Sequence, residues 1–338
     1  MFLNNLKFTA LFYFLILFGI TNYSYAQALF KKNNNINGAN LVSPPSFVSQ
    51  KTVASVKQIN ANWVSIIPYA FTNGHQPEVY FNTNFQWWGE KFEGTQQLIK
   101  YAKNENLKVM LKPHIWVKGD GWAGDYNLKS TAEWLIFEEQ YTNYALAYAK
   151  IAQQHHVELF CIATEFRQVI KERPQFWCTL IQKIKEIYKG KLTYAANWDN
   201  YQNVSFWNEL DYIGIDIYFP LSKEKTPTVD ELNKSWIPIR NELKALTNIY
   251  KKPILFTEYG YKSADYSTAG HWKTDGSEVY NAIAQKNAYQ SLYYNFWNKK
   301  WIAGGFLWKW HLTPTQHKNT QFTPQLKPVS SVIKKYYK

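Results

Sequence analysis

Apolar residues follow two alternating patterns along most of the chain. Short, mainly apolar runs with the length of a buried strand begin at Gly38, Trp63, Lys108, Leu159, Leu192, Tyr212, Ile254 and Gly304. Between most of these runs, apolar residues recur with the spacing of an amphipathic helix, and a last such segment closes the chain; the helical segments are 50–59, 95–105, 131–154, 174–188, 229–250, 283–299 and 329–336. The fifth and sixth runs are close together, and we expect only a single turn between them at Phe206 and Trp207.

Strands that alternate with helices over about 300 residues are typical of one α/β domain with a parallel sheet. The pattern therefore predicts a single (β/α)₈ TIM barrel. The alternative is an open, doubly wound sheet, but no glycine-rich nucleotide-binding motif follows the first strand.

The first residues have the features of an export signal. An apolar run from Phe8 to Ile20 follows Lys7, and Ser24-Tyr25-Ala26 supplies the small residues at which signal peptidases cleave. We expect residues 1–26 to be a secretory signal peptide, residues 27–338 to form the barrel domain, and the protein to be exported to the periplasm or the medium. The alternative is an uncleaved anchor, but the run is short for a membrane span of ~20 residues. No later segment suggests stable membrane insertion.

The net charge bears on the class of partner, and the cysteines bear on disulfide bonding. The formal net charge is +13, but the lysines are scattered along the helical segments. This distribution favours a basic, solvated surface over a nucleic-acid site. Cys161 lies in an apolar strand and Cys178 in a helical segment; we expect free thiols, with a single disulfide as the alternative.

Aromatic residues change the picture further. They make up 18% of the chain, and 15 of them are tryptophans. Large rings stabilise cores, and they also stack on sugar faces. In an exported protein this composition indicates carbohydrate chemistry.

The ends of the predicted strands carry most of the candidate chemistry, because barrel enzymes place their active sites where strands meet the following loops. Glu165 ends the fourth strand and Glu258 the seventh. A carboxyl pair surrounded by aromatic, amide and imidazole groups is the composition that a glycosidase needs. The candidate substrate-binding residues around the pair are Trp88, Lys112, His114, Trp116, Asn197, Trp198, Asp216, Tyr218 and Trp308.

Each of these residues also has a structural interpretation. A lone glutamate at a strand end is more often solvated or salt-bridged than catalytic, and the presence of two such residues favours catalysis. Asp216 is equally compatible with a structural role. For Trp308 and Trp310, a place in the core and a role as a sugar-stacking platform are both open. The histidines show no metal-ligand spacing, so we expect neither a metal nor another cofactor.

Six segments resemble one known family. They are KPHIWV (112–117), FCIATE (160–165), LTYAANW (192–198), LDYIGIDIYFP (210–220), LFTEYGY (255–261) and FLWKW (306–310). In this order they resemble glycoside hydrolase family 113, over nearly all of the chain after residue 26. The resemblance implies a retaining (β/α)₈ glycosidase that acts on β-1,4-mannans, with Glu165 as the acid/base and Glu258 as the nucleophile.

One position departs from the wider clan to which this family belongs. The residue before the acid/base is commonly Asn, which contacts the sugar 2-hydroxyl, whereas this chain has Thr164. We expect that contact to come from elsewhere, with Asn197 as a candidate.

Two other functions stay open at the level of sequence. One is a retaining glycosidase that acts on another β-linked glycan, such as a glucan or a xylan. The other is a non-catalytic, carbohydrate-binding barrel, although such a protein would normally lack one of the two glutamates. In every case the expected partner is a β-linked oligo- or polysaccharide.

Overall fold

The computed structural model describes residues 35–338 except residues 75, 120, 271–277 and 314–318. The predicted signal peptide, residues 1–26, lies outside the described residues. None of the described helices is both long and apolar enough to cross a membrane.

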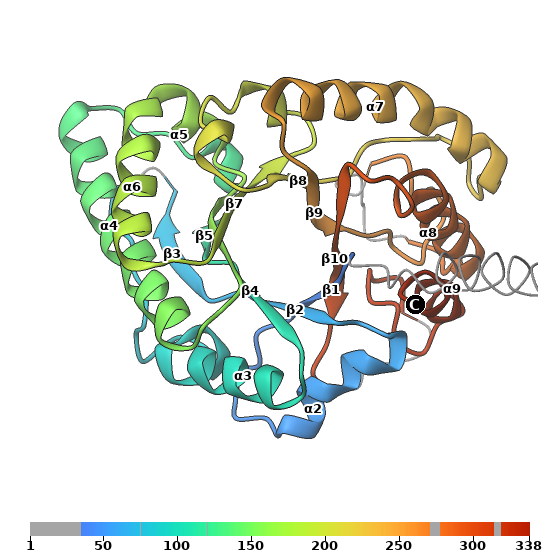
Figure 1. The fold of residues 1–338 in the computed structure, drawn as a ribbon, viewed down its shortest axis with the longest axis horizontal. Coiled ribbons are helices and arrows are strands. Elements are labelled where there is room, and N and C mark those ends of the chain that lie inside the picture. Colours follow the sequence, from blue (N-terminus) through green and yellow to red (C-terminus); the bar gives the residue numbers. More distant parts are fainter. Residues whose placement is uncertain (1–34, 75, 120, 271–277, 314–318) are drawn as a thin grey trace, which may run out of the picture. The chain divides into compact units, whose positions relative to one another are not determined.

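Parallel strands close into a barrel in the middle of the described region (Figure 1). In spatial order the barrel runs β1-β10-β9-β8-β7-β6-β4-β2, and β2 pairs with β1 to complete the circle. The strands are β1 (Ile36–Leu41), β2 (Trp63–Ile66), β4 (Lys108–Leu111), β6 (Leu159–Thr164), β7 (Lys191–Asn197), β8 (Ile213–Asp216), β9 (Ile254–Tyr259) and β10 (Ile302–Trp310). The predicted (β/α)₈ barrel is therefore confirmed.

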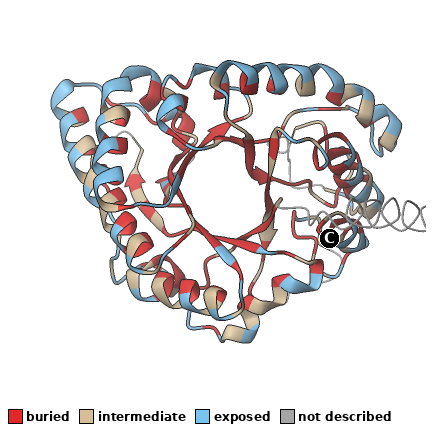
Figure 2. Ribbon diagram, viewed as in Figure 1, coloured by how far each residue is buried: buried red, intermediate tan, exposed pale blue. Residues whose placement is uncertain are grey.

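The helices surround this barrel and turn their polar faces outward (Figures 1 and 2). They are α2 (Gln50–Ala54), α3 (Phe92–Asn104), α4 (Thr131–Gln154), α5 (Arg167–Glu172), α6 (Pro174–Ile187), α7 (Val229–Tyr250), α8 (Ala282–Phe296) and α9 (Val329–Tyr336). Short 3₁₀ turns complete the connections: η1 (Ser55–Ile59), η2 (Trp88–Glu90), η3 (Ala123–Asp125), η4 (Tyr201–Asn203) and η5 (Trp207–Glu209). Two of these turns, η4 and η5, lie between β7 and β8, where only a single turn near Trp207 was expected.

Local sequence explains where several helices begin. Ser130 and Glu133 form a reciprocal capping box at the start of α4, and Thr228 and Glu231 do the same for α7. These bonds satisfy backbone N–H groups that the first helical turn leaves free. Pro174 starts α6, where its missing N–H costs nothing.

Side chains fill the barrel interior. One buried layer contains Ile36, Trp63, Met110, Leu159, Cys161, Ala195, Leu255 and Phe306. Gly38 is needed here, because a Cβ on it would lie 2.2 Å from the ring of Phe306. Trp63 is thus a core residue. Cys161 and Cys178 are free thiols, of which only Cys161 is fully buried.

Aromatic side chains pack between α4, α6 and the β6 side of the barrel. Phe166, which directly follows Glu165, is buried and contacts the rings of Tyr141 and Trp177, with centroids 5.5 and 5.8 Å away. This packing anchors the backbone beside Glu165. A large part of the aromatic content is therefore structural.

The structure adds a feature that the pattern did not predict. After β2 and β4, the chain forms two further strands, β3 (Tyr69–Asn73) and β5 (His114–Lys118), which pair in parallel as a separate two-stranded sheet. This sheet places Tyr69, His114 and Trp116 beyond the strand ends of the barrel.

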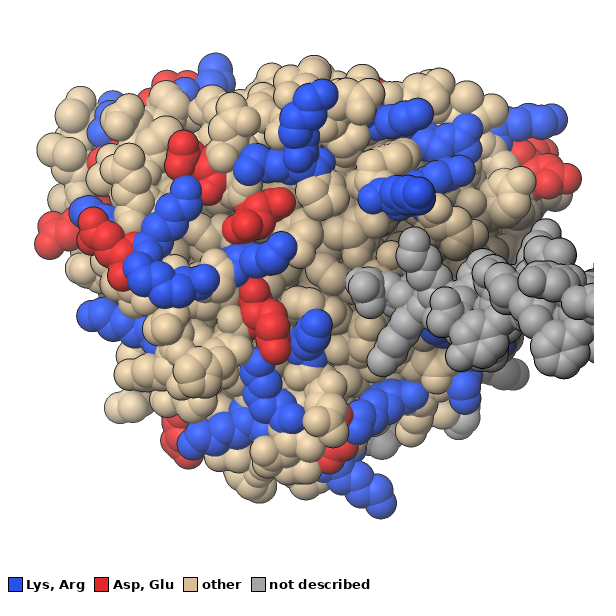
Figure 3. Space-filling view, viewed as in Figure 1, with Lys and Arg blue, Asp and Glu red and all other residues tan. Residues whose placement is uncertain are grey.

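Positive charge is distributed over the surface rather than concentrated. On the face shown in Figure 3, lysines and arginines are spread over the surface, and acidic side chains lie between some of them.

Candidate active site

Two carboxylates occupy the strand ends of the barrel. Glu258 belongs to the last part of β9 and is buried, whereas Glu165 directly follows β6 and is partly exposed. Glu165 has φ +55°, a left-handed conformation that non-glycine residues rarely adopt and that clusters at functional sites. Its backbone N–H donates to the carbonyl of Ala195 in β7 at 2.8 Å, which fixes this turn.

Both oxygens of Glu258 accept from buried donors. Lys112 Nζ forms an ion pair with Oε1, and the Tyr218 hydroxyl donates to Oε2 at 2.9 Å. Burial disfavours the charge on Lys112, but Asp216 and Glu258 outweigh burial and raise the pKa of this lysine. An ammonium and a hydroxyl donor both stabilise a carboxylate. The surroundings of Glu258 therefore suit a charged carboxylate in a fixed orientation.

Asp216 completes this buried cluster. Its Oδ1 lies 4.0 Å from Lys112 Nζ and accepts from the Thr257 hydroxyl at 2.6 Å. Burial, only partly opposed by Lys112, raises the pKa of Asp216.

The prediction that Lys112 and Asp216 contact substrate is wrong for this structure. The side chains of both residues have no exposed surface. Lys112 directly follows β4 and contacts the carboxylate of Glu258, whereas Asp216 ends β8 and its carboxylate lies 4.0 Å from Lys112 Nζ. The three side chains form one buried polar cluster, which matches the structural alternative given for Asp216.

Glu165 has different surroundings. Burial raises the pKa of Glu165 to about 7, and the negative charge of Glu258 acts in the same direction. The indole N–H of Trp122 donates to Glu165 Oε2 at 2.7 Å, which opposes this rise. The two carboxyl groups thus interact electrostatically, and the environment of Glu165 favours a proton near neutral pH.

An aromatic cavity of about 500 Å³ is lined by neither glutamate, but two residues of its wall, Tyr69 and Lys309, lie within the electrostatic influence of Glu258. Trp116 and Trp308, both predicted to bind substrate, line it. The remaining lining residues are Leu41, Val42, Ser43, Tyr69, Phe71, Phe85, Trp87, Glu90 and Lys309. The volume and the mixture of aromatic and polar walls suit a small organic ligand. Hereafter this cavity is called the aromatic cleft.

Trp88, in contrast, does not belong to the aromatic cleft. Its ring packs against Phe47, with centroids 5.4 Å apart, and its indole N–H donates to Glu93 at 3.4 Å. The neighbouring Trp87 is half exposed and lines the cleft. Trp87, and not the predicted Trp88, therefore lines the aromatic cleft.

Two buried or half-buried groups of the cleft were missed from the sequence. Burial raises the pKa of Glu90 to about 7, although the backbone N–H of Trp87 donates to its carboxylate. Lys309 follows Trp308 in β10, and burial lowers the pKa of its ammonium. These residues give the cleft one acidic and one basic group at its walls.

The other predicted contacts lie around the carboxyl pair. The ring of His114 lies beside that of Tyr69, with centroids 5.2 Å apart, and burial followed by the charge of Lys112 lowers the pKa of His114 to about 3. This imidazole is therefore neutral. Asn197 ends β7, and its amide donates to Asp199 at 2.9 Å. Trp198 is partly exposed and packs against Phe219.

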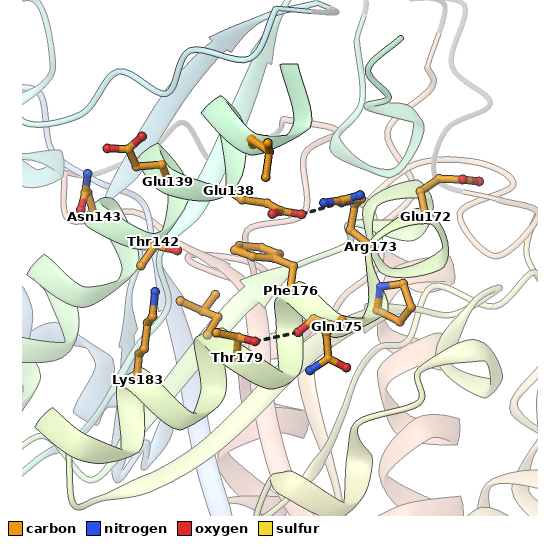
Figure 4. A pocket seen from close by; sticks show the side chains of 13 residues that line it. Glu138, Glu139, Thr142, Asn143, Glu172, Arg173, Gln175, Phe176, Thr179 and Lys183 are labelled. Carbon is orange, nitrogen blue, oxygen red and sulfur yellow. Dashed lines mark hydrogen bonds and ion pairs between the residues drawn. The ribbon is translucent and has the colours of Figure 1, made fainter. Parts of the chain in front are cut away.

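A second cavity, of about 540 Å³, lies outside the barrel between α4 and the start of α6 (Figure 4). Its wall includes Glu138 and Arg173, whose ion pair measures 2.5 Å, and the ring of Phe176. Its lining residues belong to α4 and to residues 172–183, away from the strand ends that carry Glu165 and Glu258. The barrel end is the better candidate for chemistry.

The described residues contain no group of three or more His, Cys, Asp or Glu side chains placed to hold a metal ion.

Comparison with known proteins decides the family. The profile of Glycoside Hydrolase Family 113 matches residues 45–325. The chain belongs to glycoside hydrolase family 113. It is therefore a glycoside hydrolase, and a glycan is its substrate.

Solved structures agree with this assignment. A GH113 β-1,4-mannanase superimposes with a TM-score of 0.77 at 26% identity, covering 89% of this chain and 98% of the other. A complex structure of a GH113 β-1,4-mannanase gives 0.77 at 25%, covering 90% and 98%. The GH113 β-mannanase AaManA from Alicyclobacillus acidocaldarius, in complex with ManMIm, gives 0.79 at 19% over 90% and 97%, which supports the fold. Among curated proteins, none matches the chain.

Proposed function

We propose that this family 113 enzyme is a retaining glycoside hydrolase that cleaves β-1,4-linked mannan or manno-oligosaccharides by double displacement. The observation that carries the mechanism is the contrast between the two carboxyl groups. Glu258 is held by two donors, whereas burial and Glu258 favour a proton on Glu165. Two titratable groups whose environments differ in this way suit the roles of nucleophile and acid.

In the first step, a carboxylate oxygen of Glu258 bonds to the anomeric carbon. The bond from this carbon to the glycosidic oxygen breaks, and Glu165 gives its proton to the departing oxygen. The product is a glycosyl ester on Glu258. In the second step, Glu165, now a carboxylate, takes a proton from water. The water oxygen bonds to the anomeric carbon, the ester bond breaks, and the sugar leaves with its original anomeric configuration.

The walls of the site suit an uncharged sugar chain. Trp87, Trp116 and Trp308 offer ring faces, and Glu90 and Lys309 offer an acceptor and donors for hydroxyl groups. Asn197 ends β7, the strand that pairs with β6, and is our candidate for the sugar 2-hydroxyl contact, since Thr164 is buried.

The choice of mannan rests on the solved GH113 β-1,4-mannanases, at 25–26% identity. The test is a panel of manno-, gluco- and xylo-oligosaccharides of equal length, with products resolved by chromatography and anomers followed by NMR. We expect cleavage of the β-1,4-manno series with the β-anomer formed first. Preference for the gluco or xylo series would contradict the substrate, and initial release of the α-anomer would contradict the mechanism.

We also propose that the enzyme is exported and cleaved after Ala26, on the strength of the apolar run and the small residues that follow it. N-terminal sequencing of the mature protein from its native host should begin at Gln27. Detection of Phe2 or Met1 on the mature protein would contradict this proposal.

A further inference from the structure

The indole of Trp122 forms a hydrogen bond with one carboxyl oxygen of Glu165. Its N–H donates to Oε2 at 2.7 Å. An indole nitrogen is a donor only, so Oε2 acts as the acceptor in this bond. The carbonyl oxygen of a neutral carboxyl group is a better acceptor than its hydroxyl oxygen, so this bond favours the Glu165 proton on Oε1.

Arg167 holds the Trp122 ring from the start of α5. The carbon of its guanidinium lies 4.9 Å from the ring centroid. The same guanidinium forms ion pairs with Asp125 in η3 and with Asp199 after β7, the latter at 3.2 Å. Arg167 thus joins the turns that follow β5, β6 and β7.

Gly124 and Asp199 show how closely Trp122 and Arg167 are packed into these turns. A Cβ on Gly124, in η3, would lie 2.4 Å from the six-membered ring of Trp122, so the ring is folded closely against its own turn. Asp199 also accepts from the amide of Asn197 at 2.9 Å. The network therefore reaches both the acid/base and the proposed sugar contact on β7.

Stability alone gives little reason for such a network. The Arg167 side chain is 33% exposed, and exposed ion pairs contribute little to the free energy of folding. A planar guanidinium is well suited, however, to stack on a ring and to hold two carboxylates in fixed directions.

We propose that Arg167 is a positioning residue for catalysis: it holds the Trp122 indole on Oε2 of Glu165, so that Oε1 presents its proton to the departing glycosidic oxygen. This role rests on the proposed function of Glu165 as acid/base. Loss of Arg167 releases the indole, so the Glu165 carboxyl rotates more freely. The carboxylate form also loses a donor, which raises its proton affinity.

The experiment compares two substrates that differ in their need for an acid. A dinitrophenyl β-mannoside has a leaving group that departs without protonation, whereas a mannose leaving group in a manno-oligosaccharide needs it. For Arg167→Met we expect kcat on the oligosaccharide to fall about 10- to 100-fold, because small misplacements of a catalytic group cost this much. Formation of the glycosyl-enzyme from the dinitrophenyl substrate, measured as the pre-steady-state burst, should stay nearly unchanged.

Two further variants make the result specific. Trp122→Phe removes the N–H and should reproduce both the selective loss and a shift of the basic limb of the pH profile to higher pH. The double variant Arg167→Met with Trp122→Phe should be no worse than Trp122→Phe alone, because both changes break one interaction. Arg173→Met is the matched control: this arginine also pairs with an acid and is 29% exposed, but it lies at the outer cavity.

If the role of Arg167 were purely structural, its loss would lower the rates on both substrates equally, leave the pH profile unchanged, or give additive losses of activity in the double variant. Each of these outcomes overturns the proposal. Glu165→Ala, measured in parallel, separates this from a failure of the proposed function. If Glu165→Ala shows no dependence on the leaving group, the acid/base assignment is wrong, and the role of Arg167 falls with it.

Discussion

Glu165 and Glu258 are the same amino acid, and their neighbours make them different. Lys112 and Tyr218 hold the two oxygens of Glu258. Trp122 donates to one oxygen of Glu165, and the negative charge of Glu258 lies nearby. At the scale of residues, the two carboxyl groups therefore differ: donors hold both oxygens of Glu258, whereas the surroundings of Glu165 favour its protonated form.

The first prediction concerns pH. Burial and Glu258 raise the pKa of Glu165 to about 7, so the acid is protonated below this pH and loses its proton above it. Because the first step needs the proton, kcat/KM for an oligosaccharide should fall as the pH rises through about 7. For a dinitrophenyl glycoside the same limb should be much weaker. Identical basic limbs for the two substrates would argue against Glu165 as the acid.

The second prediction concerns the buried cation. Lys112→Met would leave Glu258 and Asp216 without their counter-charge in the barrel interior, and breaking a buried pair costs about 3–5 kcal/mol of folding free energy. We expect a loss of that size in urea denaturation, together with a severe loss of kcat. The control is Lys118→Met, an exposed lysine in β5. An active, equally stable Lys112→Met variant would show that this lysine does not hold the nucleophile.

At the scale of elements, the positions of the barrel strands could be predicted from the sequence, whereas part of the loop geometry could not. Barrel strands are buried on both faces, so their apolar runs are strong signals. The small sheet of β3 and β5 follows Pro68 and Pro113, and its half-exposed residues resemble loop positions. Trp122 gave no signal, because its contact with Glu165 joins two loops across 43 positions in the chain. Lys112 and Asp216 were predicted as site residues. Their complete burial was not predicted, because the sequence alone does not show which strand-end side chains point into the barrel.

The third prediction uses adjacent tryptophans at the start of η2. Trp87 lines the aromatic cleft, whereas the ring of Trp88 packs on Phe47. Trp87→Ala should lower kcat/KM for mannotetraose by about 5- to 30-fold, which corresponds to the loss of 1–2 kcal/mol of ring contact, with little change in thermal stability. Trp88→Phe is the control and should keep the activity. The reverse result would place the sugar on the other side of η2.

At the scale of the whole molecule, the barrel brings together residues that are far apart in the chain. β9 supplies Glu258, β6 precedes Glu165, and both β10 and η2 contribute side chains to the wall of the aromatic cleft. The fold class was predictable because one pattern repeats along the chain. The tertiary contacts, such as Trp122 with Glu165 or Lys112 with Glu258, appear only when the barrel closes.

The measurement that tests the central claim most directly is chemical rescue by azide of Glu165→Ala and Glu258→Ala. On a dinitrophenyl β-mannoside, Glu165→Ala should still form the glycosyl ester on Glu258 but hydrolyse it slowly, because no base activates water. Azide needs no base, so it should restore turnover and give the β-mannosyl azide. Glu258→Ala should lose hydrolysis for every leaving group. The account would be contradicted if azide rescued Glu258→Ala to the α-mannosyl azide while Glu165→Ala gained nothing, since the two roles would then be reversed.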